Sequence, residues 1–135
     1  MNKELQELKK NKKSFKRFIK SFKYCYEGIA YAFYHEQNII VMMIIGIITL
    51  ALGIVFKLSL AERLAVIITV GLVLSLEMIN TGLEAVVDLV TKDRKPLAKV
   101  AKDAASGAVG IMCIFAVIEG LMIFVPKFIM LFKGM

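Results

Sequence analysis

Histidine and cysteine, on which many catalytic and metal sites depend, are scarce in this chain of 135 residues. His35 is the only histidine, which excludes a metal site built from several histidines. Cys25 and Cys113 lie far apart and form no C-x-x-C pair, so we expect free thiols rather than zinc ligands or a redox pair. A metal site built from several His or Cys side chains is therefore not expected.

The sequence also lacks the nucleotide-binding patterns of common soluble enzymes. Neither the P-loop motif G-x-x-x-x-G-K-[ST] nor the glycine-rich loop of protein kinases occurs in it. A nucleotide site in this chain must therefore be of another kind.

Charge is absent from long stretches of the chain, although 21% of its residues are charged. Hydrophobic residues make up 59% of the sequence, far above the share in soluble domains, and their long runs are typical of a membrane protein. A net charge of +7 would suggest a nucleic-acid partner for a soluble protein. In a membrane protein, Lys and Arg on the cytoplasmic side explain it better, so we expect no nucleic-acid partner.

The apolar runs predict an all-α integral membrane fold with three spans. We expect transmembrane helices over residues 39–56, 64–90 and 104–125. The polar turn 57–63 separates the first two spans, and the charged segment 91–103, with Pro96 as a breaker, separates the last two. Pro126 is expected to end the third span.

The N-terminal part has a different pattern. Residues 1–14 are polar and Lys-rich and are interpreted as a tail. Residues 15–36 place apolar side chains at i, i+3, i+4 and i+7, with most basic side chains outside that stripe. This pattern predicts a basic amphipathic helix lying in the membrane interface. Residues 1–135 are expected to form a single domain.

Basic residues predict the orientation in the membrane. Residues 1–38 hold nine Lys and Arg and residues 91–103 hold five, whereas residues 57–63 hold two. The positive-inside rule therefore places the first two segments, and the N-terminus, in the cytoplasm, with the C-terminus outside.

The second predicted span ends in an unusual segment, LEMINTGLEAVVDL, at residues 76–89. At 100° per residue its polar side chains share one stripe, about 100° wide and roughly 16 Å long: Glu77, Asn80, Thr81, Glu84 and Asp88. The stripe is expected to start inside the cytoplasmic leaflet and to end at the headgroups. Ionisable residues within a span indicate function, although pairing with Lys or Arg purely for helix packing is an alternative.

Carboxylates clustered with an amide suit Mg²⁺, and Mg²⁺ suggests a polyphosphate ligand. Basic residues predicted nearby would offset phosphate charge: Lys99 and Lys102 on segment 91–103, Arg17 and Lys20 on the surface helix.

Two motifs resemble those of the bacterial diacylglycerol kinase family, which includes the undecaprenol kinases of Gram-positive bacteria. The family signature is similar to E-x-x-N-[ST]-x-[IL]-E-x-x-x-D, which reads here Glu77-x-x-Asn80-Thr81-x-Leu83-Glu84-x-x-x-Asp88. A second element, A-K-D followed by small residues, reads here Ala101-Lys102-Asp103-Ala104-Ala105. The resemblance covers nearly the whole chain from about Phe15.

The resemblance implies a homotrimer with active sites shared between subunits, and a lipid kinase that uses ATP and Mg²⁺. It implies that Glu77 is the catalytic base and that Glu36 and Glu84 bind the metal, with Asn80 beside them.

The same resemblance implies a nucleotide site. Lys102 and Asp103 match residues of that site, with Lys102 near the phosphates, and Arg17 and Tyr24 match residues around the nucleotide. Lys20 is added here as a nearby cation, and Asp88 matches the last acid of the signature.

The expected reaction is phosphoryl transfer from ATP to a lipid alcohol at the cytoplasmic face of a bacterial cell membrane. Undecaprenol is the preferred acceptor, and diacylglycerol is the alternative. A small proton-coupled transporter and a non-enzymatic membrane assembly protein are rival interpretations, but neither accounts for an acidic stripe that reaches the cytoplasmic surface.

Several positions depart from the family pattern. Lys99 stands where some members have Gly, Tyr26 stands where some have Trp, and residues 36–41 lack an Arg found in some members. Glu119, the only formal charge of the third predicted span, has no counterpart in the signature. It is interpreted as structural, reaching outward, staying protonated or pairing with Lys57 or Arg63.

Overall fold

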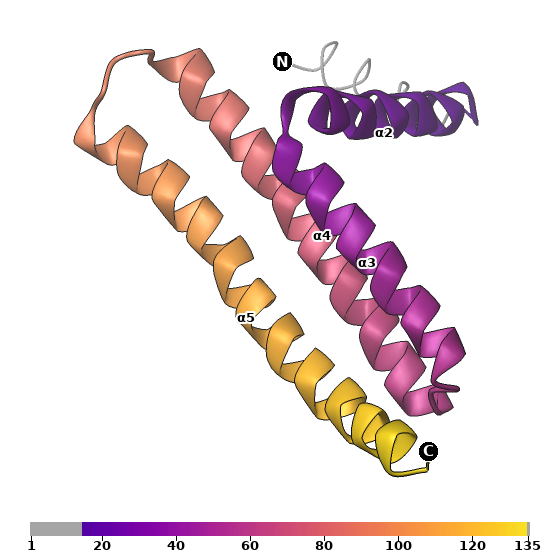
Figure 1. The fold of residues 1–135 in the computed structure, drawn as a ribbon. Coiled ribbons are helices and arrows are strands. Elements are labelled where there is room, and N and C mark those ends of the chain that lie inside the picture. Colours follow the sequence, from indigo (N-terminus) through magenta and orange to yellow (C-terminus); the bar gives the residue numbers. More distant parts are fainter. Residues whose placement is uncertain (1–14, 135) are drawn as a thin grey trace. The chain divides into compact units, whose positions relative to one another are not determined.

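The structure, a computed structural model, describes residues 15–134 and is all-helical over that range (Figure 1). Its helices are α2 (Phe15–His35), α3 (Gln37–Val55), α4 (Leu60–Val90) and α5 (Pro96–Lys133). The last three are long and apolar enough to cross a membrane, which confirms the predicted all-α membrane fold. The predicted polar tail, residues 1–14, lies outside the described residues.

The chain divides into two compact units, one ending at His35 and one beginning at Glu36. The first unit contains α2, whose apolar side chains are largely exposed along one stripe, Phe18, Phe22 and Ile29 among them. Phe18 and Phe22, four residues apart, pack edge to face with ring centroids 5.1 Å apart. This is the local pattern of an amphipathic helix whose apolar face needs a non-aqueous neighbour.

The second unit is a bundle in which α4 packs against both α3 and α5 (Figure 1). Gly46 allows the close approach of α3 to α4, because a Cβ atom there would lie 2.8 Å from Cγ1 of Val70. A small apolar core of Leu58, Val66 and Phe124 closes the end of the bundle where α3 turns into α4.

That turn is tighter than the predicted polar turn 57–63, and α4 begins at Leu60 rather than Leu64. The reason is a capping box: Ser59 Oγ accepts from the Glu62 backbone N–H at 3.3 Å, and Glu62 accepts from the Ser59 N–H at 2.7 Å. Two N–H groups that a helix start leaves unpaired are satisfied in this way, so the helix gains an extra turn.

The expectation that segment 91–103 is a loop broken by Pro96 was wrong. α5 begins at Pro96, and only residues 91–95 form the turn after α4. Proline is favoured at the first position of a helix, because its ring fixes a helical φ and its missing N–H has no intrahelical partner there. Lys99, Lys102 and Asp103 therefore lie on a helix, which fixes their spacing.

The third predicted span was expected to end at Pro126, but the helix itself does not end there, because α5 continues through Pro126 to Lys133. An internal proline removes one helical hydrogen bond, and contacts beyond it hold the helix in place. Phe128 packs on Phe56 with ring centroids 4.6 Å apart, and Lys127 Nζ lies 3.1 Å from Glu62 Oε1. Tertiary packing thus overrides the local signal.

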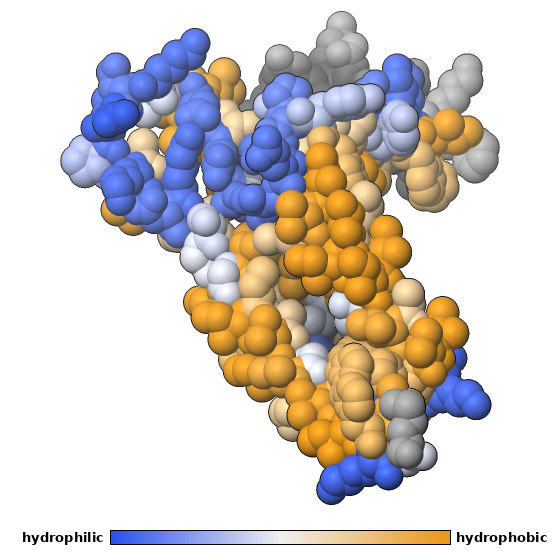
Figure 2. Space-filling model, in the orientation of Figure 1, coloured by the Kyte–Doolittle hydropathy of each residue, from blue (hydrophilic) through white to orange (hydrophobic). Residues whose placement is uncertain are grey.

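The outer surface of the α3–α5 bundle is apolar over most of its length. Figure 2 shows orange side chains along the three helices, with blue side chains at the end of the α4–α5 turn and at the opposite end. Large exposed apolar side chains occur on every helix of the bundle, such as Ile47, Ile68 and Ile118. An apolar surface of this kind fits hydrocarbon better than water.

Candidate active site

The polar stripe of α4 is buried where it begins. Among the described residues, the buried polar side chains are Glu77, Asn80 and Thr81, with exposed fractions of 2%, 6% and 5%. Val66 and Val73 are buried on the same face, as expected for residues separated by three, four or seven positions in a helix. The first half of the predicted stripe therefore faces protein, whereas Glu84 is half-buried and Asp88 is exposed.

Hydrogen bonds connect these side chains, but two of their oxygens have no hydrogen-bond partner among the described residues. Asn80 Nδ2 donates to Glu84 Oε1 at 3.1 Å, and Thr81 Oγ1 donates to the Glu77 backbone carbonyl at 3.0 Å. Glu77 Oε1 and Asn80 Oδ1 are buried without a hydrogen-bond partner in the described chain. Buried polar oxygens are nearly always paired in proteins, so both atoms are available to a ligand or a neighbouring group.

The start of α3 completes the acidic cluster. The Asn38 side chain lies beside the Glu77 carboxylate, and Glu36 and Glu84 are the acidic neighbours of Glu77. Glu36 occupies the N-cap position of α3, but its side chain makes no capping hydrogen bond. The Glu36 carboxylate therefore does not cap the backbone N–H groups at the start of α3.

The three acids of the cluster form no ion pairs within the described part of the chain. Over residues 15–134, none of Glu36, Glu77 and Glu84 forms an ion pair with Lys or Arg. Lys102 is a basic neighbour of Glu84, although the two side chains form no ion pair. The packing alternative raised by the sequence is thus not supported.

Basic side chains lie close to the α4–α5 turn, at the cytoplasmic end of the polar stripe predicted from the sequence. Lys102 Nζ on α5 lies 2.6 Å from Asp88 Oδ1 on α4, and Lys99 Nζ lies 2.5 Å from Asp103 Oδ2 one turn away. These four residues line a cavity of about 600 Å³ at the α4–α5 turn, together with Arg94 and other residues of the turn. A cavity with this mixture of charges suits a phosphate-bearing ligand better than an apolar one.

The donor set fits magnesium. In the described part of the chain, no three His, Cys, Asp or Glu side chains form a preassembled metal-binding group. Mg²⁺ rarely needs one, because it is usually held by one or two carboxylates, waters and substrate phosphates. Glu36 and Glu84, the acidic neighbours of Glu77, supply two carboxylates of the right chemistry, and the Asn80 amide group lies beside Glu84.

Three predicted nucleotide-site residues lie on α2 and therefore in the other compact unit. Arg17, Lys20 and Tyr24 are all exposed and share one helix face, since they are spaced by three and four positions. Their part in the site stays a prediction.

Asn38 is a candidate site residue that the sequence reasoning missed. It lies two positions after Glu36, at the start of the first apolar run, where a polar side chain is easily taken for a simple boundary residue. The sequence shows only that Asn38 directly precedes the predicted span 39–56. Its contact with Glu77 depends on how α3 packs against α4.

Three long apolar helices with a partly buried acidic cluster at one end define a class of integral membrane protein with an intramembrane polar site. Residues 23–124 match the prokaryotic diacylglycerol kinase family. The chain belongs to this family and is an ATP-dependent lipid kinase of the membrane.

Individual relatives agree with this assignment. The chain is 38% identical over 119 residues to undecaprenol kinase from Bacillus subtilis (strain 168), covering 88% of this chain and 97% of the relative. It is 37% identical over 112 residues to diacylglycerol kinase from Synechocystis sp., covering 82% of this chain and 64% of the relative. It is 31% identical over 108 residues to diacylglycerol kinase from Escherichia coli (strain K12), covering 80% and 88%.

Proposed function

We propose that the protein phosphorylates undecaprenol, with diacylglycerol as the second candidate acceptor. Undecaprenol is preferred because the chain is similar to the Bacillus subtilis undecaprenol kinase. The similarity extends over 97% of that kinase at 38% identity. The matches to diacylglycerol kinases are the observation that favours the second acceptor.

In the proposed reaction, the lipid hydroxyl oxygen attacks the γ-phosphorus of ATP. A new oxygen–phosphorus bond forms, the bond from the γ-phosphorus to the bridging oxygen breaks, and ADP leaves. Glu77 accepts the hydroxyl proton. Its buried Oε1 atom, which has no partner in the described chain, supports this role because it is free to accept a hydrogen bond from the substrate.

The remaining residues of the acidic cluster would bind the metal. Glu36 and Glu84 would hold Mg²⁺, with the Asn80 amide oxygen beside them, and the bound ion would offset the charge of the ATP phosphates. Asn80 also donates to Glu84, which orients that carboxylate.

Charged side chains around the α4–α5 turn would bind the nucleotide. Lys102 would contact the phosphates, and Asp103 and Asp88 would orient the lysines through the pairs that they form. On α2, Arg17, Lys20 and Tyr24 are proposed to contact the nucleotide. Phosphoryl transfer depends on positioning and charge stabilisation of this kind more than on covalent chemistry.

The proposed topology places the N-terminus and the α4–α5 turn in the cytoplasm and the C-terminus outside. The distribution of basic residues supports it, and it lets ATP reach the site from water while the lipid stays in the membrane. Labelling of single cysteines introduced at Lys92 and Lys57, with a membrane-impermeant maleimide, would show the first protected and the second accessible in intact cells.

We further propose a homotrimer in a bacterial cell membrane, with each site shared between neighbouring subunits. The extensive exposed apolar surface, and the buried oxygens that have no hydrogen-bond partner among residues 15–134, support an assembly. Native mass spectrometry from detergent micelles gives the test, and a monomeric active enzyme would contradict the proposal.

The choice of acceptor is tested with purified protein in micelles. The protein is supplied with radiolabelled ATP and with undecaprenol or diacylglycerol in parallel assays. Labelled undecaprenyl phosphate should form with the higher kcat/KM. A preference for diacylglycerol would move the protein to the second candidate, and no labelled lipid from either would remove the kinase proposal.

A further inference from the structure

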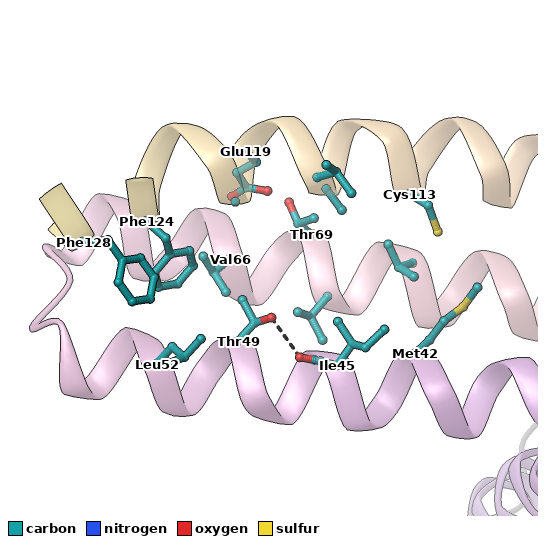
Figure 3. Close-up of a pocket in the computed structure, with 16 residues that line it drawn as sticks. Met42, Ile45, Thr49, Leu52, Val66, Thr69, Cys113, Glu119, Phe124 and Phe128 are labelled. Carbon is teal, nitrogen blue, oxygen red and sulfur yellow. Dashed lines mark hydrogen bonds between the residues drawn. The ribbon is translucent and has the colours of Figure 1, made fainter. Parts of the chain in front are cut away.

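A second cavity lies in the α3–α5 bundle, apart from the acidic cluster. Its volume is about 400 Å³, within the range of pockets that hold small-molecule ligands. All three helices contribute to its wall, which is mostly apolar and includes Met42, Gly46, Val66, Val73, Cys113 and Phe124. Figure 3 shows these helices facing one another across it.

The cavity continues the same face of α4 that carries the acidic cluster. At 100° per residue, Val73, Val70 and Val66 lie within about 40° of Glu77. At 1.5 Å per residue, Val73 is about 6 Å from Glu77 along the axis of α4 and Val66 about 16 Å. The cavity thus begins about one turn beyond the proposed base and leads away from the α4–α5 turn.

The direction of the cavity fits the geometry of a lipid alcohol. The basic side chains for the phosphates lie on the α4–α5 side of Glu77, so the hydrocarbon part of a bound lipid must run toward the other side. That side is the apolar interior of the bundle, where burying hydrocarbon is favourable.

Resting on the proposed lipid kinase function, we propose that this cavity holds the hydrocarbon tail of the lipid alcohol while its hydroxyl group lies at Glu77. The cavity then selects the acceptor by the length and shape of its tail. The part nearest Val73 receives the segment next to the hydroxyl group, and the part near Val66 receives a more distant segment.

Glu119 places a polar group in the wall of this cavity. Its Oε1 atom is buried without a partner in the described residues, and it faces α4 near Thr69 (Figure 3). The other wall hydroxyl labelled there, Thr49, already donates to the Ile45 carbonyl at 2.8 Å. A hydrocarbon tail offers Glu119 no hydrogen bond, so this side chain makes the part of the cavity near Thr69 less favourable for the tail than a purely apolar wall would.

Gly120 gives a direct test, because it lines the cavity and a Cβ atom there would meet no atom within 4 Å. Gly120→Leu should fill the cavity without displacing a helix backbone, and Gly120→Ala should fill it partly. Gly110→Leu is the matched control, since Gly110 lies on the same helix with equally open space but outside the cavity wall.

The measurement is steady-state phosphorylation of undecaprenol and of farnesol, a short prenol, by the purified full-length protein. Gly120→Leu should raise KM for undecaprenol by about tenfold, the scale of steric discrimination in an apolar pocket, with a smaller change for farnesol. Gly120→Ala should give an intermediate effect, and Gly110→Leu should behave like the unchanged protein. Equal effects on both acceptors, or no effect on either, would overturn the tail site.

A second measurement does not depend on the folding of a variant. A prenol with a photoreactive group in its tail should label peptides of α3, α4 and α5 that line the cavity. Labelling confined to outward-facing positions, or loss of the oligomer in Gly120→Leu, would show that membrane lipid or another subunit occupies this region and would overturn the proposal. If the unchanged protein phosphorylates neither acceptor, the kinase proposal itself fails.

Discussion

At the scale of single residues, the acidic cluster combines burial with incomplete hydrogen bonding. Glu77 is 2% exposed, yet one of its oxygens has no partner in the described chain. A carboxylate in this setting is costly to bury, which argues that its contribution is to function rather than to stability.

Replacing Glu77 by Gln tests the proposed base. Glu77→Gln keeps the shape of the side chain and removes its ability to accept a proton, so kcat should fall at least about 100-fold. ATP binding and oligomeric state, measured by isothermal titration calorimetry and native mass spectrometry, should remain. Glu27→Gln, at an exposed position of α2, serves as the control. Normal turnover in Glu77→Gln would rule out this base.

Replacing Glu84 by Gln tests the proposed metal site. Loss of one negative oxygen ligand should raise the Mg²⁺ concentration required for half-maximal activity by roughly tenfold or more, the scale seen for groups that support a metal site. Binding of Mn²⁺, followed by electron paramagnetic resonance without turnover, should weaken in parallel. Unchanged Mn²⁺ binding in Glu84→Gln would exclude this residue as a ligand.

At the scale of helices, the ends of α4 and α5 are set by specific side-chain chemistry. Ser59 and Glu62 cap the start of α4 reciprocally, and Pro96 opens α5. Lys127 on α5 also reaches Glu62, so the same carboxylate joins the start of α4 to the second half of α5.

Removing the N-cap of α4 should lower the stability of the fold without changing the candidate active site. Ser59→Ala loses the N-cap acceptor and should destabilise the fold by about 1 kcal/mol. The expected readout is a lower midpoint of thermal unfolding in micelles, with KM for ATP unchanged. Ser75→Ala, at an exposed position within the same helix, should leave the midpoint where it is. Equal midpoints for the two variants would mean that the cap contributes nothing measurable.

At the scale of the whole molecule, the α3–α5 unit separates two environments along one helix face. Near the α4–α5 turn the face is acidic and lies next to a cavity with charged walls, and further along α4 it borders an apolar cavity. A substrate with one polar end and one hydrocarbon end fits this division.

Glu119 is the exception within the apolar half. Over residues 15–134 it forms no ion pair, so the alternative of pairing with Lys57 or Arg63 is not seen, and Arg63 donates to the Leu58 carbonyl at 3.0 Å. Glu119→Leu should raise the thermal midpoint, because an unpaired buried polar atom typically costs about 1–3 kcal/mol. Glu27→Leu should not raise it, and a lower midpoint for Glu119→Leu would show that the carboxyl has a partner in the assembled protein.

The sequence by itself determined the three spans, the amphipathic helix and the polar face of α4. These features depend on local periodicity and on the length of apolar runs, which a membrane enforces strongly. It also indicated the acidic residues, because the aligned carboxylates of an apolar helix need no knowledge of its neighbours to be recognised.

Only the tertiary structure decided which groups meet. Asn38 reaches Glu77 and Lys102 pairs with Asp88 because α3 and α5 pack on α4, and such contacts leave no periodic trace in the sequence. In the same way, the continuation of α5 past Pro126 depends on a contact between Phe128 and Phe56, at the end of α3. The apolar cavity is the clearest case, since a space between three helices is a property of their packing and of no single segment.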